Sequence, residues 1–116
     1  MFILSNASTG HIIANKITQP RGWYKRTLGL MGCESLEEGE GIWLDDCWGI
    51  HTIGMKFSID ILFLNEELRI TGMERDVKPG RLAVSQSQAR HIIELAIGTL
   101  DKNELLKGDR VRIATA

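Results

Sequence analysis

Three polar residues in the middle of the chain are of types that could carry acid–base chemistry. His51 and Thr52 are adjacent, and Asp60 follows within a stretch of alternating residues. A histidine and an aspartate within hydrogen-bonding distance are the minimum for a general base with an orienting carboxylate. In the structural alternative, backbone groups or Thr52 satisfy His51, and Arg26 or backbone N–H groups satisfy Asp60. We expect a ligand-facing pair, for which His51→Ala and Asp60→Asn leave the melting temperature within a few degrees.

Arg26 and Glu94 could complete a polar cleft with these three residues. The guanidinium of Arg26 can pair with Asp60, with Glu94 or with an anionic group of a ligand, and internal pairing is the simpler expectation. Glu94 alternates with apolar neighbours, so it could equally be an outward-facing strand charge. The candidate ligand-binding residues are therefore Arg26, His51, Thr52, Asp60 and Glu94.

The spacing of the possible metal ligands does not predict a metal centre. Cys47 and His51 would share one face of an extended segment, and Cys33 could join them, but zinc sites usually show tighter paired spacing. No Gly-rich segment is followed by the Lys and Ser/Thr of a phosphate-binding loop. We expect neither a metal nor a cofactor.

Two tryptophans flank the acidic pair at positions 45 and 46. If Trp43 and Trp48 are exposed, they could stack on a sugar or a peptide. As core residues they need no ligand, and this second interpretation is the simpler one.

Short strands must position these residues. Polar and apolar residues alternate from residue 55 to residue 63, which predicts a strand with Ile59, Ile61 and Phe63 in the core. The turn residues at 65–67 predict a β-hairpin with residues 68–71, in which Asn65 can adopt the left-handed conformation. Further strands are predicted at residues 89–97 and 111–113, and residues 2–4 and 11–14 are predicted to form an opening hairpin.

Two short helices are predicted between the strands. Thr18 can cap a helix that ends near Gly32, because Pro20 is tolerated in a first turn and apolar residues recur at helical spacing. Asp101 and Glu104 have capping-box spacing for a second helix of one or two turns. Together these elements predict a mainly antiparallel β-structure.

The composition is that of one small globular domain over residues 1–116. Of its 116 residues, 43% are hydrophobic and 25% are charged, which suits a single core and is unlike a disordered chain. A formal net charge of -1 gives no general excess of positive charge for binding nucleic acid. The sequence shows neither a signal peptide nor a membrane span, so we expect a cytoplasmic protein with reduced thiols at Cys33 and Cys47.

Five segments occur in an order that is specific as a set. They are residues 26–31 (RTLGLM), 47–55 (CWGIHTIGM), 59–64 (IDILFL), 93–99 (IELAIGT) and 108–109 (GD). From about residue 12 to residue 113, the chain thereby resembles the family called domain of unknown function number 192, widespread in bacteria and archaea. The resemblance implies a mainly β fold: a compact antiparallel β-sandwich or jelly-roll-like barrel with one or two short helices.

Three functions follow as hypotheses for this uncharacterised conserved protein. In the first, a small β-sandwich module binds a small ligand, peptide or glycan in a cleft that contains the candidate residues. In the second, a small hydrolase or metal-assisted enzyme uses His51 and Asp60. In the third, the chain is a structural accessory domain. Because no nucleophile, base and orienting residue form a complete set, we favour a binding module, whose partner is a small ligand or protein rather than nucleic acid or membrane.

Overall fold

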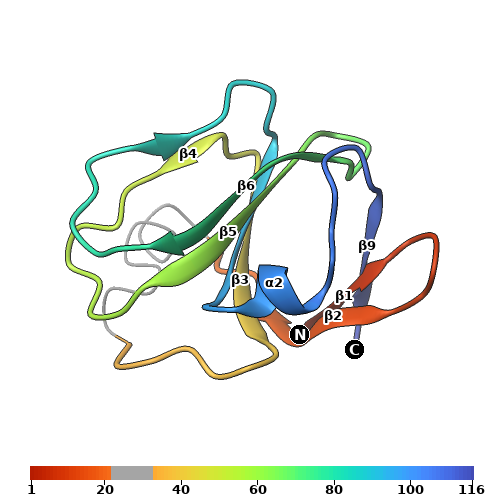
Figure 1. Ribbon diagram of the computed structural model, residues 1–116, viewed down its shortest axis with the longest axis horizontal. Helices are drawn as coiled ribbons and strands as arrows, with labels where there is room; N and C mark the ends of the chain where they lie inside the picture. The colour runs from red at the N-terminus through yellow and green to blue at the C-terminus, as the bar shows by residue number, and fades with distance from the viewer. Residues whose placement is uncertain (22–32) are drawn as a thin grey trace.

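The computed structural model describes residues 1–21 and 33–116, and it confirms the mainly β prediction (Figure 1). The strands are β1 (Phe2–Asn6), β2 (Ile12–Thr18), β3 (Glu40–Asp45), β4 (Gly49–Ile50), β5 (Ile59–Leu64), β6 (Ile70–Val77), β7 (Val84–Ser85), β8 (His91–Ala96) and β9 (Val111–Thr115). The described helix is α2 (Thr99–Lys102). The helix predicted from Thr18 to Gly32 lies outside the described residues except at its start, where Thr18 ends β2.

Seven strands form one large sheet, in the order β6-β5-β8-β3-β2-β1-β9, and β4 pairs with β7 in a separate two-stranded sheet. The predicted antiparallel architecture contains one parallel pair among the described strands, where Lys16 to Thr18 of β2 lie opposite Glu40 to Ile42 of β3. A parallel pair needs a crossover connection of about a dozen residues or more, and residues 19–39 supply that length.

The large sheet curls until its two edges touch at one end. Arg69, just before β6, forms an isolated antiparallel bridge with Arg110, just before β9. Backbone hydrogen bonds of 2.8 Å run from the Ile70 N–H to Asp109 O and from the Gly108 N–H to Ile70 O. Farther along, β6 and β9 are separate, so the described strands do not close into a barrel (Figure 1).

The central strands separate two hydrophobic cores, because alternate residues of a strand point to opposite faces of its sheet. The first core contains Leu4, Ile13, Ala14, Ile17, Leu62, Leu64, Ile70, Ile93, Leu95, Leu100, Leu105 and Val111. The second core contains Ile42, Leu44, Met55, Ile59, Ile61, Phe63, Val77, Val84, Ala89 and Ile92. Every residue of β5 is buried, since a core covers each of its faces. The predicted core positions Ile59, Ile61 and Phe63 are confirmed.

The β5–β6 hairpin confirms the predicted turn but gives Asn65 a different role. The side-chain carbonyl of Asn65 accepts hydrogen bonds from the N–H groups of Glu67 and Arg69, at 3.0 and 2.9 Å. The left-handed conformation belongs instead to Leu68, whose φ is 63°. Asn65 therefore stabilises the turn through its side chain.

The second predicted helix is displaced toward the N-terminus. Helix α2 begins at Thr99, directly after Gly98, whose φ is 88°. Glu104 lies beyond the helix with a φ of 47°, so Asp101 and Glu104 do not form the predicted capping box. Leu100 is fully buried in the first core, and α2 thus covers one end of that core. In the described part of the chain, no helix is long and apolar enough to cross a membrane.

Candidate functional site

Asp60 lies against the first core and uses both carboxylate oxygens within the scaffold. It alternates with Ile59 and Ile61, so its side chain points to the face of β5 opposite the second core. Its Oδ1 accepts a hydrogen bond from the Asp76 N–H and its Oδ2 accepts one from the Leu100 N–H, both at 3.0 Å. Asp60 thereby connects β5 to the end of β6 and to α2. These contacts agree with the structural alternative, in which backbone N–H groups satisfy the carboxylate.

Thr52 is completely buried and fastens the β6–β7 connection to the segment after β4. Its hydroxyl donates to Lys78 O at 2.8 Å and accepts a hydrogen bond from the Arg81 N–H at 2.9 Å. Its backbone N–H donates to Arg81 O and its carbonyl accepts from the Gly80 N–H, both at 2.9 Å. Thr52 therefore fixes the turn that immediately precedes Leu82.

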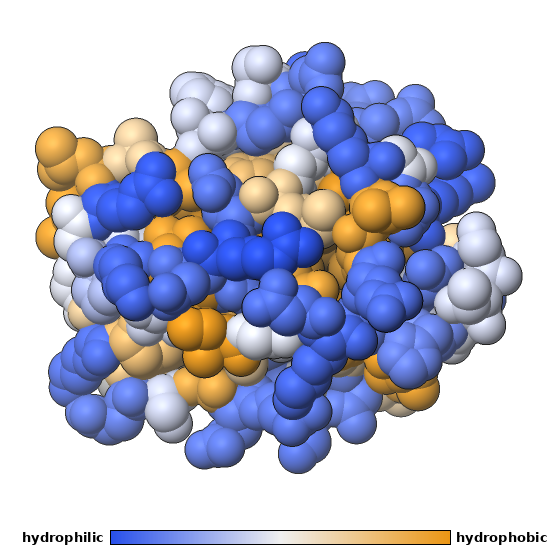
Figure 2. All heavy atoms as spheres, in the orientation of Figure 1, coloured by the Kyte–Doolittle hydropathy of each residue, from blue (hydrophilic) through white to orange (hydrophobic). Residues whose placement is uncertain are grey.

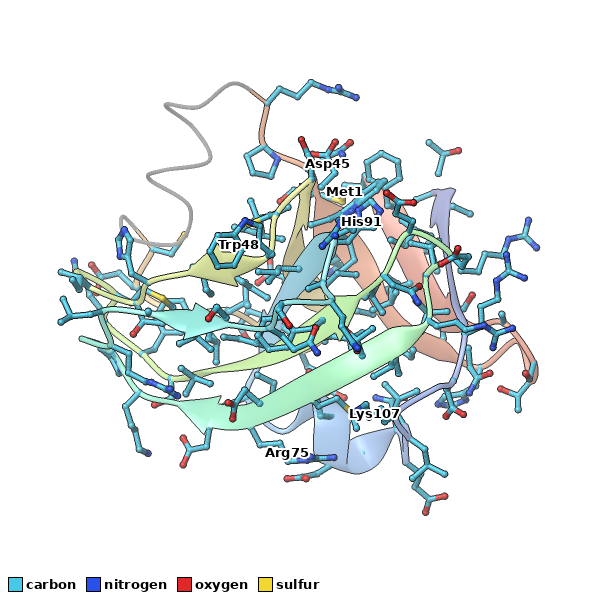
Figure 3. The ribbon with its side chains drawn as sticks, turned by 90° about the horizontal axis from the view of Figure 1, so that it is seen from above. Met1, Asp45, Trp48, Arg75, His91 and Lys107 are labelled. Atoms are coloured by element: carbon cyan, nitrogen blue, oxygen red, sulfur yellow. The ribbon has the colours of Figure 1, made fainter. Side chains whose placement is uncertain are left out.

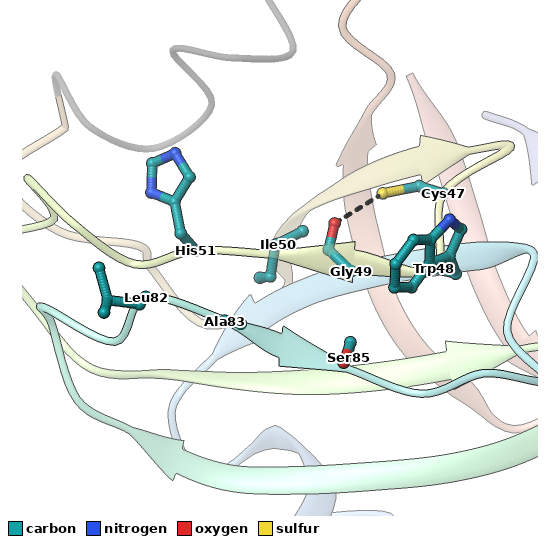
Figure 4. A pocket seen from close by; sticks show the side chains of 8 residues that line it. All are labelled: Cys47, Trp48, Gly49, Ile50, His51, Leu82, Ala83 and Ser85. Carbon is teal, nitrogen blue, oxygen red and sulfur yellow. Dashed lines mark hydrogen bonds between the residues drawn. The ribbon is translucent and has the colours of Figure 1, made fainter.

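A hollow of about 440 Å³ opens beside the two-stranded sheet of β4 and β7 (Figure 4). This hollow is lined by Cys47, Trp48, Gly49, Ile50, His51, Leu82, Ala83 and Ser85. Its volume is in the range of small-molecule pockets. Among the lining side chains, the polar groups are the His51 ring, the Ser85 hydroxyl, the Cys47 thiol and the indole N–H of Trp48, and the rest of the lining is apolar.

Gly49 allows β4 to lie close to β7, and large exposed residues bound the hollow. A Cβ atom at Gly49 would lie 3.1 Å from the Cβ of Ser85, so a side chain at position 49 would crowd this part of the sheet. Trp48 is 62% exposed and Leu82 is 81% exposed. Figure 4 shows these two side chains at opposite ends of the hollow. Both offer apolar surface to a bound group.

Exposure alone does not single out these two residues. On the face seen in Figure 2, hydrophobic residues reach the surface at several places between hydrophilic ones. The exposed large hydrophobic residues also include Ile12, Leu106 and Met1, and single exposed apolar residues are normal in folded proteins. Trp48 and Leu82 are distinguished because they share one hollow.

His51 is exposed at the end of the hollow where Leu82 lies (Figure 4). The β4–β7 sheet covers the second core through Ile50 and Val84. Asp60 faces the first core, on the other side of β5, so the structure does not bring His51 and Asp60 together. Among the predicted site residues that are described, His51 is the one that lines the hollow.

Cys47 is a half-buried thiol between the hollow and the second core. Its Sγ–H donates a hydrogen bond to Gly49 O at 3.2 Å. Cys33 also packs against the second core, and both cysteines are free. Over residues 1–21 and 33–116, no three histidine, cysteine or acidic side chains gather as they would around a metal ion.

Glu94 lies near the centre of the large sheet, on the face of β8 that carries the second core. Its cross-strand neighbours are Ile42 of β3 and Ile61 of β5. The residue is 5% exposed, and its Oε2 has no hydrogen-bond partner among the described residues. Burial raises the pKa of the Glu94 carboxyl to about 7. The alternative of an outward-facing strand charge is therefore wrong, because a second layer covers this face.

Trp43 packs against the first core, in contrast to Trp48. Its indole N–H donates to His91 Nδ1 at 3.1 Å, and the ring of Phe2 packs edge-on with centroids 5.1 Å apart. His91 lies opposite Asp45 at the end of the central strands (Figure 3). Burial lowers the pKa of His91, although nearby carboxylates act in the opposite direction. The lowered pKa favours the neutral imidazole, whose Nδ1 can accept the hydrogen bond from Trp43. Trp43 is thus part of the scaffold.

Arg26 lies outside the described residues, so its pairing with Asp60 or Glu94 stays a prediction. Nothing in the sequence singles out Leu82, Ala83 and Ser85 as site residues. The turn at residues 78–80 marks the start of their segment, but no hydrophobic period follows it. Their place in the hollow depends on pairing with β4, more than 30 residues earlier.

Comparison with known proteins identifies related folds. A structure of a proposed transcription regulator from Sinorhizobium meliloti 1021 has a TM-score of 0.81 at 19% identity, covering 96% of this chain and 90% of that chain. A protein of unknown function from Novosphingobium aromaticivorans DSM 12444 has a TM-score of 0.80 at 17% identity, covering 96% and 82%. At these identities the likeness shows the fold alone. No curated protein matches the chain, while a family model described as Uncharacterized ACR matches residues 5–113.

Proposed function

The chain belongs to the uncharacterised family domain of unknown function 192, and from its own geometry we propose that it is a ligand-binding module. The site is the hollow beside β4 and β7. The observation that carries the proposal is that two large apolar side chains, Trp48 and Leu82, stand exposed at the ends of one hollow of small-molecule size.

The lining favours an apolar or aromatic group over a glycan. A sugar needs several hydrogen bonds, and the side chains of the hollow supply few groups for them. The Cys47 thiol already donates to Gly49 O, which leaves the His51 ring, the Ser85 hydroxyl and the indole N–H of Trp48. We therefore infer that the ligand is a small molecule or a peptide that inserts an aromatic or aliphatic group.

Each lining residue has a distinct role in this proposal. The indole of Trp48 stacks on the inserted group, and Leu82 packs against its other end. His51 and Ser85 offer hydrogen bonds that orient the ligand at the edge of the hollow. Thr52 acts indirectly, because its hydroxyl fixes the turn before Leu82. The role is binding rather than catalysis, since Asp60 faces the other core and cannot orient His51.

Tryptophan fluorescence can test this proposal with simple probes. We expect p-cresol, as a small aromatic probe, to change the emission of the wild-type protein in a saturable way. The disaccharide N,N′-diacetylchitobiose should have little effect, because the hollow lacks the polar groups to hold it. Trp48→Ala should abolish the saturable response.

Leu106→Ala is the matched control, because Leu106 is also a large exposed apolar residue but does not line the hollow. This variant should respond to p-cresol as the wild type does. Binding of p-cresol to Trp48→Ala with unchanged affinity, measured by ligand-observed NMR, would place the site elsewhere and refute the proposal.

A further inference from the structure

Glu94 differs from the other buried polar side chains of the described fold in its hydrogen bonding. These buried side chains are Thr52, Asp60, Thr71, Glu94 and Thr99. The hydroxyl of Thr71 donates to Gln86 Oε1 at 2.9 Å, and that of Thr99 donates to Ala96 O at 2.6 Å. Thr52 and Asp60 each have two partners, as described above. Within residues 1–21 and 33–116, the one buried side-chain oxygen without a partner is Glu94 Oε2.

Asp60 provides a comparison on the neighbouring strand. Both residues are acidic, both are buried in the large sheet, and β5 and β8 are paired. The Asp60 oxygens accept hydrogen bonds from two backbone N–H groups. Glu94 instead lies between Ile42 and Ile61 and faces the second core, which is formed by apolar side chains. The described residues therefore satisfy both carboxylate oxygens of Asp60 but leave Glu94 Oε2 without a hydrogen-bond partner.

A buried carboxyl oxygen that has no partner among the described residues is unfavourable for folding in such surroundings. Transfer of an ionised carboxylate into an apolar environment is strongly disfavoured unless a cation or hydrogen-bond donors compensate for the lost water. Burial is the cause that raises the pKa of Glu94 to about 7. Near neutral pH the group is thus close to the midpoint of its ionisation, and a suitable partner would stabilise the charged form.

We propose that Glu94 is a buried receptor for a cationic ligand group with N–H donors, either a guanidinium or a primary ammonium. Such groups form charge-assisted hydrogen bonds with a carboxylate, and a guanidinium can use both of its oxygens. A divalent metal ion fits less well, because it needs several ligands and no cluster of metal-ligating side chains is present in the described residues.

In this proposal, a ligand would reach Glu94 through the layer that covers the second core. Apolar side chains that remain partly exposed pack against the second core, among them Cys33, Leu36 and Phe57. Glu94 itself retains 5% exposure. A ligand that displaces covering side chains reaches the carboxyl without breaking the strand pairs on either side of it. This site is separate from the hollow beside β4 and β7, whose lining does not include Glu94.

Thermal unfolding with agmatine, which carries a guanidinium and an ammonium, tests the proposal. At about pH 8, where the carboxylate is mostly ionised, agmatine should raise the melting temperature in a saturable way. At ten times the dissociation constant, we expect a rise of roughly 4 °C or more. Sodium chloride at matched ionic strength should not reproduce it. Near pH 7, binding should also release protons, so the calorimetric binding enthalpy should depend on the buffer.

Glu94→Gln preserves the shape of the side chain and removes its charge, so it should fold and lose the agmatine response. Glu74→Gln is the matched control, because Glu74 is an exposed glutamate on β6 opposite Ile61. This control should keep the full response, as should Trp48→Ala, which separates this proposal from the one for the hollow. An equal response in Glu94→Gln, no saturable response in the wild type, or stabilisation by zinc or calcium alone would each overturn the proposal.

Discussion

Replacing Glu94 by glutamine should remove a pH-dependent loss of folding stability. Burial places the pKa of Glu94 at about 7 in the folded chain, against 4.5 for an ordinary glutamate. Because one pKa unit corresponds to about 1.4 kcal/mol, this difference corresponds to about 3 kcal/mol of folding free energy. This effect is a large fraction of the usual margin of stability of a small domain, which is roughly 5–15 kcal/mol.

The direction of the effect follows from where the proton is bound. Below about pH 4.5 the carboxyl is protonated in both states, and its ionisation does not affect the free energy of unfolding. Between pH 4.5 and about 7 the unfolded chain loses the proton while the folded chain keeps it, so stability falls as the pH rises. Above that range both states are ionised and the full loss is present. A carboxylate stabilised by the fold has the opposite pH dependence.

Urea unfolding of the wild type and of Glu94→Gln at about pH 4.5 and pH 8 measures this effect. The stability of the variant relative to the wild type should increase by about 3 kcal/mol between the two pH values. Glu74→Gln should show little such change, because Glu74 is exposed. If the difference between the wild type and Glu94→Gln is the same at both pH values, Glu94 has an ordinary pKa and the reasoning from its burial is refuted.

Substitutions at four further residues test their individual roles. Asp60→Asn should cost roughly 1–3 kcal/mol in urea unfolding, because an amide NH₂ would face a backbone N–H that now donates to the carboxylate; full stability would contradict this. His51→Ala should leave the melting temperature within a few degrees, since the ring is exposed. Thr52→Val should destabilise the fold by roughly 1–3 kcal/mol, whereas Thr52→Ser should retain most of the stability because it keeps the hydroxyl that bonds to Lys78 O and the Arg81 N–H. Ile61→Ala should cost roughly 2–5 kcal/mol, and a cost near zero would mean that its face of β5 is not packed.

The sequence by itself determined the features that depend on local pattern. Alternation predicts that Ile59, Ile61 and Phe63 share one face, and they do so in the second core. Turn residues predict the hairpin between β5 and β6, and the ordered motifs predict the family that matches residues 5–113. These predictions succeed because strand period and turn chemistry act over a few residues. The cytoplasmic location, the single-domain organisation and the lack of a nucleic-acid partner remain predictions from the sequence.

Only the tertiary structure decided which polar residues have partners. Asp60 and Glu94 both alternate with apolar residues in the sequence, yet they face different cores on adjacent strands. Backbone N–H groups of β6 and α2 donate hydrogen bonds to the Asp60 carboxylate. Among the described residues, by contrast, no group donates a hydrogen bond to Glu94 Oε2. Likewise, the hollow exists because β7 brings Leu82 beside β4. Periodicity specifies which residues share a face, but distant segments determine what covers that face and which hydrogen bonds it receives.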